Sequence, residues 1–498
     1  MEAIVHVTGG KIRGRTENGI SRFLGIPYAA APVGPARFQA PAPVAEWPGI
    51  RDALEFGATC AQSPYPPPID ALIGSDGIPG DDYLNLNVWT PEVGGSGLPV
   101  MVWIHGGAFT RGSNARTMYD GTTFARDGVV LVSINYRLGI SGFAVVEGAP
   151  HNRGLRDQVF ALEWVRRNIA AFGGDPGNVT IFGESAGGMS VLDLIASPPA
   201  RGLFQRAIAQ SANGSTVATA QDAAEVTRHL AGLLGIEPTA AAFGDLDPAR
   251  LRAAQDELAR DVMLDPDPAR WGATVIANGF GVMSLFPVID GEFVLARPTD
   301  VLAAEPDRTV PLLIGWTAEE YRFFTFLTGA AAGITEQVLP FAVARYGLDP
   351  TVVATYAANR PGASPADVFC AIITDLAFRD DALRIADSTS RASNPTYVYE
   401  FAWRSPVADL GACHVLEIPF VFGRPDALPT LTGPNPPRAI ADDMHGAWVS
   451  FATNGSPGWT PYDTDSRIIR VFDAPESADV PLPRADDLHA LRQARPKP

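Results

Sequence analysis

A serine in a glycine-bounded corner is the first feature of this 498-residue chain that could do chemistry. Residues 179–198 read VTIFGESAGGMSVLDLIASP, in which Ser185 lies between Gly183 and Gly187. An apolar, β-branched run precedes this G-x-S-x-G segment, a helix-forming run follows it, and no other stretch of the chain fits the pattern. Glycines at these positions remove side chains that would clash in a strained strand-to-helix turn, which leaves the serine hydroxyl exposed. The segment therefore predicts that Ser185 is a nucleophile.

A glycine-rich turn after another apolar run could stabilise the negative charge that forms when a serine attacks an acyl group. The segment IHGGAF places His105, Gly106 and Gly107 directly after the run PVMVW. Backbone N–H groups of glycines can approach a developing oxyanion closely. We assign Gly106 and Gly107 to an oxyanion hole with Ala186 as the third N–H donor, and we expect a structural role for His105.

The base that deprotonates the serine must be one of seven histidines. In an α/β enzyme with this corner, the nucleophile precedes the acid and the histidine along the chain, which excludes His6, His105 and His151. His229 lies in an Ala-rich helical stretch and His489 in the terminal segment, where positions on a solvated face are expected. His414, in LGACHVLEIPFVFG, follows a predicted strand through a loop of small residues. His414 is therefore the first candidate for the base and His445 the second.

The elements that must position these residues alternate between strands and helices. Residues 99–107, 128–139 and 178–183 are nearly unbroken apolar runs, which are typical of parallel strands covered on both faces. Residues 155–171 carry an apolar stripe at helical spacing, formed by Leu155, Val159, Leu162, Val165 and Ile169. The alternation predicts an α/β fold with a mostly parallel central sheet flanked by helices. We expect two further helical segments, about 215–305 and 335–392, to be insertions packed over one end of the sheet.

Composition and charge exclude several classes of function. A net charge of -17 and a pI near 4.8 argue against partners with phosphate backbones or anionic lipid surfaces. The N-terminal residues lack the basic and apolar regions of a secretory leader, and we expect a cytoplasmic protein. The three cysteines, Cys60, Cys370 and Cys413, lie far apart without metal-ligand spacing. We therefore expect no nucleic acid, membrane, metal or cofactor as a partner.

Blocks along nearly the whole chain resemble one family, the type-B carboxylesterases of the carboxylesterase and cholinesterase group. Besides the segments above, they include FLGIPYAAAPVGPARF, DDYLNLNVWTP, NYRLGISGF, LFQRAIAQSAN and WVSFATNGSPGWTPY. The resemblance implies an α/β-hydrolase fold as a single domain over residues 1–498. It also implies Ser185 as the nucleophile and His414 as the base.

The resemblance extends to the acid of a catalytic triad. The family carries this acid in a Gly-x-x-x-Asp-Glu-Gly stretch after a strand, and GWTAEEY of this chain puts it at Glu320, five residues after Gly315. Glu319 stands where Asp is usual and Tyr321 where Gly is usual, which leaves Glu319 as the rival acid. Glu184 and Ser211 resemble residues that support the triad from a second layer, although an ordinary buried hydrogen-bonding role fits each equally well.

One departure from the family concerns the cysteines. Secreted members join a cysteine like Cys60 to one in a Glu-Asp-Cys-Leu stretch, but this chain carries Tyr83 at that second position. Because Tyr83 cannot form a disulfide, we expect Cys60 to be a reduced, buried thiol. This expectation agrees with a cytoplasmic location.

The predicted function is hydrolysis of carboxylic esters through an acyl-enzyme intermediate. Short to medium acyl or aromatic esters are the expected substrates, and a monomer or weak homodimer is the expected assembly. The same triad could serve carbamates, amides or aromatic polyester oligomers, and a cholinesterase-like binding protein without catalysis is the remaining alternative. Aromatic candidates for the substrate pocket are Phe109, Trp271, Phe280, Phe286, Phe323 and Phe324, although such residues in insertions are more often core.

Overall fold

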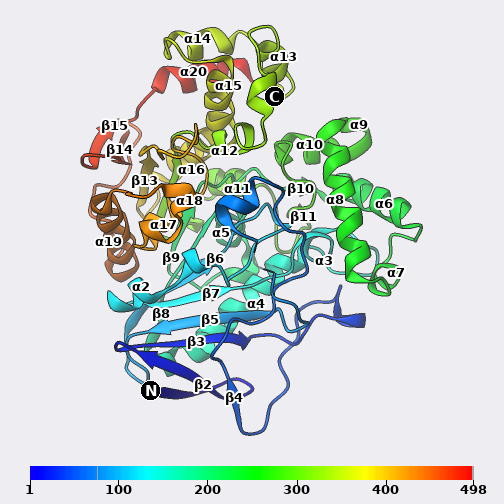
Figure 1. The fold of residues 1–498 in the computed structure, drawn as a ribbon, viewed down its shortest axis with the longest axis vertical. Coiled ribbons are helices and arrows are strands. Elements are labelled where there is room, and N and C mark those ends of the chain that lie inside the picture. Colours follow the sequence, from blue (N-terminus) through cyan, green and yellow to red (C-terminus); the bar gives the residue numbers. More distant parts are fainter. Residues whose placement is uncertain (76, 496–498) are drawn as a thin grey trace.

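The central element of the structure, a computed structural model that describes residues 1–75 and 77–495, is one large sheet (Figure 1). Among these residues thirteen strands pair in the order β1-β2-β3-β5-β7-β6-β8-β9-β12-β13-β14-β15, with β4 beside β2. The strands are β1 (Glu2–Val7), β2 (Gly10–Glu17), β3 (Ile20–Pro27), β4 (Ile50–Asp52), β5 (Asn85–Thr90), β6 (Leu98–Ile104), β7 (Val130–Ile134), β8 (Gly174–Glu184), β9 (Arg206–Gln210), β12 (Leu312–Thr317), β13 (Thr396–Phe401), β14 (Ile468–Phe472) and β15 (Ala478–Pro481). Along this order the pairs from β7 to β14 are parallel and the outer pairs are antiparallel. The predicted, mostly parallel central sheet is confirmed.

Helices cover both faces of the sheet. Strand β6 shows why, because successive side chains on a strand point to opposite faces. Val100, Val102 and Ile104 pack in the apolar cluster that contains residues of α4 (Arg153–Asn168) and α5 (Ala186–Ala196). Met101 and Trp103 pack in a second cluster with residues of α2 (Thr122–Arg126), α17 (Ile418–Val421) and α19 (Arg438–Asn454). Both faces of this strand are buried, as its unbroken apolar run predicts.

The predicted helix at 155–171 is confirmed with a small difference at its end. Its five-residue apolar stripe is buried throughout. However, α4 ends at Asn168, and the last stripe residue, Ile169, begins a 3₁₀ turn that ends at Phe172. The turn leads directly into β8, which carries the serine corner.

Two long helical excursions separate strands that are neighbours in the sheet. The first lies between β9 and β12 and holds α6 (Ala220–Leu234), α7 (Ala240–Gly244), α8 (Pro248–Leu264), α9 (Pro268–Trp271), α10 (Ala273–Gly279), α11 (Pro298–Ala304) and the paired short strands β10 (Ala218–Thr219) and β11 (Val288–Ile289). The second lies between β12 and β13 and holds α12 (Arg322–Thr325), α13 (Leu339–Ala344), α14 (Val352–Ala358), α15 (Pro365–Thr374) and α16 (Asp380–Thr389). In Figure 1 their outer helices, α6–α10 and α13–α15, form two groups away from strands β2, β3 and β4.

Short helices complete the chain. They are α1 (Ile69–Ile73), α3 (Gly139–Phe143), α18 (Pro429–Thr432) and α20 (Ala485–Ala494). No helix in the described part of the chain is long and apolar enough to cross a bilayer. Over residues 1–75 and 77–495 there is also no group of His, Cys, Asp and Glu arranged to hold a metal ion.

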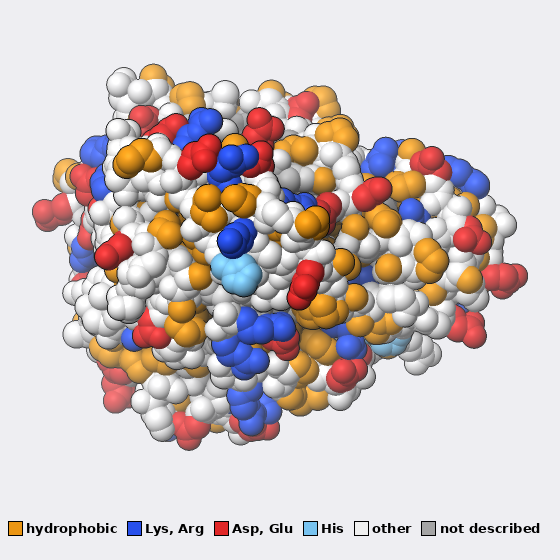
Figure 2. Space-filling view, turned by 90° about the horizontal axis from the view of Figure 1, so that it is seen from below, with side chains coloured by type: hydrophobic (Ala, Val, Ile, Leu, Met, Phe, Trp, Pro, Cys, Tyr) orange, Lys and Arg blue, Asp and Glu red, His pale blue; other side chains and the backbone are white. Residues whose placement is uncertain are grey.

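On the face shown in Figure 2, several basic side chains gather in a central column, and acidic side chains lie beside it. On the outward side of β2, for example, Arg13 pairs with Asp52 at 2.6 Å and Arg15 with Glu17 at 3.5 Å. The positive charges of these two arginines are therefore balanced by neighbouring acidic side chains.

Candidate active site

The corner that carries Ser185 connects β8 to α5 in a strained backbone conformation. Ser185 has φ 57° and ψ -126°, which is an uncommon region for a residue with a side chain. A methyl group added to Gly187 would lie 2.0 Å from the Ile104 carbonyl oxygen, and one added to Gly183 would lie 2.5 Å from the Gly187 carbonyl carbon. The Ser185 N–H donates to the Gln210 carbonyl at 3.0 Å, which ties the corner to β9. The strand-turn-helix context predicted from sequence is therefore present.

Three backbone N–H groups beside this corner are available for a ligand. A methyl group added to Gly106 would lie 3.1 Å from Ser185 Cβ, so the Gly106 loop touches the serine. Gly106 and Ala186 are buried, and Gly107 is half-buried. None of the hydrogen bonds between described residues uses the N–H of Gly106, Gly107 or Ala186. Because buried N–H groups are nearly always paired, these three are candidates for binding a substrate oxygen.

His105 holds the Gly106 loop in place. Its ring stacks on Tyr136 with centroids 4.6 Å apart, its Nδ1 lies 2.8 Å from the Gly106 carbonyl oxygen, and the Tyr136 hydroxyl donates to the His105 carbonyl. Burial lowers the pKa of His105 to about 4. An imidazole that remains neutral and packed in this way has the structural role expected for it.

His414 and Glu320 meet because the strands that precede them are neighbours. Glu320 follows β12, His414 lies in the loop after β13, and these strands pair in parallel up to Thr317 and Phe401. Glu320 Oε2 lies 2.5 Å from His414 Nδ1, and Glu320 Oε1 accepts from the Thr317 N–H at 2.8 Å. Both side chains are buried. The carboxyl ends of parallel strands form the usual site edge of such a sheet.

The rival acid, Glu319, points elsewhere. Its carboxylate accepts from Arg404 Nη1 at 2.7 Å and from the Ala412 N–H at 2.9 Å. Glu319 therefore braces the loop that carries His414, whereas Glu320 contacts the imidazole itself.

The second candidate base, His445, lies in a different environment. Its Nδ1 faces the Val421 carbonyl at 2.8 Å, its Nε2 faces Asp127 at 3.0 Å, and its ring packs on Phe124. Both ring nitrogens are engaged by groups outside the serine corner. His445 is thus a packed residue between α19 and α2.

Buried carboxyl groups surround His414. Glu184, directly before the serine, places Oε1 at 3.1 Å from His414 Nε2. Burial, reinforced by Glu320, raises the pKa of Glu184 well above its ordinary value. Burial likewise raises the pKa of Glu417, whose Oε1 accepts from Gln210 Nε2 at 3.2 Å. Raised pKa values favour neutral acids here, which limits the negative charge around the imidazole.

Sequence reasoning missed Glu417. The available signal was a single acidic residue inside the apolar segment HVLEIPFVFG, since a lone buried carboxyl is costly unless it has a role. Ser211, by contrast, was expected in this layer. It follows β9, its N–H donates to the Gly315 carbonyl at 2.8 Å, and its buried hydroxyl has no hydrogen-bond partner among the described residues.

Three phenylalanine rings enclose His414. Its ring centroid lies 6.1 Å from Phe323, 5.1 Å from Phe324 and 5.2 Å from Phe378. Phe323 and Phe324 come from the pocket residues proposed from sequence. Phe378 does not; it lies in a π-helical turn, Asp375–Arg379, between α15 and α16. Such turns are rare and frequently occur at functional sites, but no sequence pattern indicates them.

The other aromatic candidates lie in packed environments. Phe109 is buried against Phe143, Phe286 is buried in the main core, and Trp271 is buried against His229 with its indole N–H on the Asp265 carbonyl. Phe280 is half-buried at the end of α10. Of the six, only Phe323 and Phe324 have a ring contact with His414 in the described residues.

Tyr321 explains one departure from the family pattern. Its hydroxyl donates to the Phe280 carbonyl at 3.0 Å and lies 2.8 Å from the Tyr346 hydroxyl. The residue next to the acid therefore links the end of α10 to the segment after α13. A glycine at this position could make neither contact.

Cys60 and Tyr83 explain the other departure. Cys60 is a free, buried thiol whose sulfur accepts from the Leu138 N–H at 3.4 Å, and burial raises its pKa to about 12. The Tyr83 hydroxyl donates to the Pro32 carbonyl at 3.3 Å. As predicted, no disulfide closes the loop between them.

Comparisons with known proteins identify the family to which the chain belongs. The model of the carboxylesterase family matches residues 1–475. The chain is 36% identical over 491 residues to a para-nitrobenzyl esterase of Bacillus subtilis, covering 95% of each protein. It is 35% identical over 495 residues to a phenmedipham hydrolase of Pseudarthrobacter oxydans, covering 96% of each. The crystal structure of a carboxylesterase of Geobacillus stearothermophilus superposes with a TM-score of 0.84 at 35% identity, covering 98% of this chain and 99% of that one.

The α/β-hydrolase fold and the serine corner thus define a hydrolase, and the comparisons agree with the fold. The chain belongs to the carboxylesterase family, and it is a carboxylic ester hydrolase that acts on small-molecule esters.

Proposed function

We propose that Ser185, His414 and Glu320 form the catalytic triad of this esterase and that Gly106, Gly107 and Ala186 form its oxyanion hole. The observation that carries the proposal is the 2.5 Å contact between Glu320 Oε2 and His414 Nδ1. Because Nδ1 of His414 is hydrogen-bonded to Glu320, Nε2 is the ring nitrogen that can accept a proton from the serine.

The reaction follows from these positions. Ser185 Oγ attacks the ester carbonyl while His414 Nε2 takes its proton, and the three N–H groups stabilise the oxyanion. His414 then protonates the leaving alcohol, and water attacks the acyl-enzyme by the same steps in reverse. Glu320 orients the ring and stabilises the imidazolium. Glu184 lies 3.1 Å from Nε2, and burial raises its pKa, which favours its neutral form beside the imidazole.

Substrate preference is proposed from the rings around His414. Phe323, Phe324 and Phe378 make the wall beside the base apolar, which favours short to medium acyl or aromatic esters. Similarity to a phenmedipham hydrolase favours carbamates as a second substrate class. Both classes would use the same serine.

Hydrolysis of p-nitrophenyl esters from acetate to laurate, by the native protein and by Ser185→Ala, tests the triad. We expect the rate to peak at short chains and to fall by about 10⁴-fold or more in the variant. A phenyl carbamate in the same assay tests the second class. Equal rates in both proteins, with the variant folded by circular dichroism, would exclude Ser185 as the nucleophile.

We also propose that residues 1–498 form one domain with the helical excursions as insertions, and that the enzyme works in the cytoplasm as a monomer or weak homodimer. The single domain is supported by the sheet, because β9 pairs with β12 and β12 with β13 although a helical excursion separates each pair in sequence. The free Cys60, with Tyr83 where secreted relatives have its disulfide partner, supports the cytoplasmic location.

A further inference from the structure

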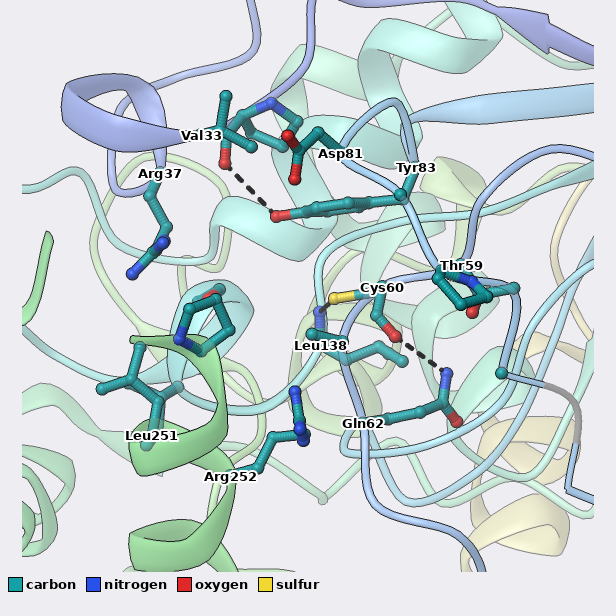
Figure 3. Close-up of a pocket in the computed structure, with 18 of the residues that line it drawn as sticks. Val33, Arg37, Thr59, Cys60, Gln62, Asp81, Tyr83, Leu138, Leu251 and Arg252 are labelled. Carbon is teal, nitrogen blue, oxygen red and sulfur yellow. Dashed lines mark hydrogen bonds between the residues drawn. The ribbon is translucent and has the colours of Figure 1, made fainter. Parts of the chain in front are cut away.

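A cavity of about 440 Å³ lies apart from the residues assigned to the triad and the oxyanion hole, none of which lines it. Its walls come from the segments around residues 32–37, 59–62 and 77–83, the start of α3, and α8 (Figure 3). This volume is in the range of small-molecule sites. The cavity also coincides with the place where Cys60 and Tyr83 depart from the disulfide of secreted relatives.

One part of the wall is apolar or aromatic. Tyr83 extends its ring across the cavity in Figure 3, with its hydroxyl already committed to the Pro32 carbonyl. Leu138 and Leu251 contribute aliphatic surface from the two helical sides, and Val33 contributes from the first segment. These side chains can take the hydrocarbon part of a ligand.

Two amide side chains of the wall make hydrogen bonds within the protein itself. Gln62 donates to the carbonyls of Cys60 and Gly112 and accepts from the Gly112 N–H at 2.7 Å. Gln255 accepts from the Ile140 N–H at 3.1 Å. These amides hold the frame of the cavity. Charged groups of the wall offer stronger hydrogen bonds to a ligand than neutral ones do.

Two guanidinium groups reach toward the cavity from different walls. Figure 3 shows Arg37 entering from the N-terminal segment and Arg252 from α8. Arg252 is half-buried and makes no hydrogen bond or ion pair with any residue that the structure describes. Arg37 donates through Nη1 to the Leu246 carbonyl at 2.7 Å, which leaves its other N–H groups free of described partners. The wall contains one acid, the exposed Asp81, so cations outnumber anions two to one.

We propose that this cavity binds a small organic monocarboxylate with an apolar or aromatic body, held by Arg37 and Arg252. A planar carboxylate matches the paired N–H groups of a guanidinium, and the Tyr83 ring and leucines cover the hydrocarbon part. An inorganic anion would satisfy the guanidinium groups but leave the apolar wall uncovered. In a chain of net charge -17, two guanidinium groups without an acidic partner among the described residues make this cavity a locally favourable place for an anion.

The test is calorimetric titration of the full-length protein with sodium benzoate and sodium octanoate. Ser185 is first blocked with an organophosphate, and intact mass reports the modification, so that carboxylate binding at the serine is suppressed. A missing mass shift would contradict the proposed nucleophile, whereas the cavity is judged separately by the arginine variants.

We expect binding of one carboxylate per chain, weakened about tenfold or more in Arg252→Gln and in Arg37→Gln. Arg260→Gln is the matched control, because Arg260 is an exposed residue of the same helix outside the cavity and the change removes the same charge. Its affinity should equal that of the native protein. Thermal unfolding of all three variants checks that they are folded.

Neutral and inorganic probes distinguish the ligand class. Benzamide should bind about tenfold or more weakly than benzoate, and inorganic phosphate more weakly than octanoate. Benzoate affinity that is unchanged in Arg252→Gln, equal binding of benzamide, tighter binding of phosphate, or no carboxylate binding to the folded native protein would each overturn the proposal.

Discussion

The proposed nucleophile half of the site, around Ser185, and the proposed base half, around His414, are built in different ways. Ser185 is fixed by five consecutive residues, two of which are glycines. At both glycines the neighbouring backbone is so close that an added methyl group would lie only 2.0–2.5 Å from a backbone atom. His414 is fixed by side chains from two segments distant from it in sequence. The segment after β12 supplies Glu320 at 2.5 Å and the ring of Phe324 at 5.1 Å, and the π-helical turn supplies the ring of Phe378 at 5.2 Å. The first half depends on local backbone geometry, whereas the second depends on strand order and helix packing.

The two adjacent acids offer the sharpest test of the base half. Glu320→Gln should lower kcat/KM for p-nitrophenyl acetate by about 10³- to 10⁴-fold, because the imidazolium loses its charged partner. Glu319→Gln should lower it by less than about tenfold, because Glu319 contacts Arg404 and the Ala412 N–H rather than the ring. Steady-state kinetics of both variants gives the comparison. A larger loss in Glu319→Gln would reverse the assignment of the acid.

The nucleophile half should be broken by one methyl group. Gly187→Ala should destabilise the fold by about 3 kcal/mol or more, since the new Cβ would lie 2.0 Å from the Ile104 carbonyl oxygen in a backbone that is held on both sides. Urea unfolding measures the change. Gly446→Ala is the control, because Gly446 lies in α19 with no atom within 4 Å of an added Cβ. That variant should be unchanged or up to about 1 kcal/mol more stable.

If Gly187→Ala unfolds at the same urea concentration as the native protein, steric exclusion of a side chain at Gly187 does not define the corner.

Glu417 gives a smaller, pH-dependent test of the base half. Its pKa is raised above the ordinary 4.5, so the folded state binds a proton that the unfolded state releases. This contribution to stability is complete below pH 4.5 and is lost as the pH rises toward the folded pKa. Glu417→Gln should therefore differ from the native protein by only about 1 kcal/mol near pH 4.5, and its stability relative to the native protein should increase as the pH rises above that value. A stability difference that stays constant over this range would mean that Glu417 is ionised in the folded protein.

The features that the sequence predicted correctly are those set by interactions between residues close along the chain. The helix from Arg153, the strand before Ser185 and the need for glycine on both sides of the serine follow from periodicity and sterics within short segments. The burial of β13, by contrast, depends on tertiary packing: all six of its residues are buried, with Val398 in one apolar cluster and Tyr397 and Tyr399 in the other. The acid was narrowed to two neighbouring glutamates by resemblance, and only the geometry distinguishes their contacts.

The sequence by itself determined the α/β class and the glycine-bounded corner of Ser185, because each depends on residues close along the chain. The glycine donors and His414 were proposed from the same kind of local pattern. The tertiary structure decided which glutamate touches His414, that Glu417 and Phe378 join it, and that Arg37 and Arg252 share a cavity. These contacts join residues that are far apart in sequence. They depend on the neighbouring places of β12 and β13, on a π-helical turn and on the packing of α8, none of which a local pattern encodes.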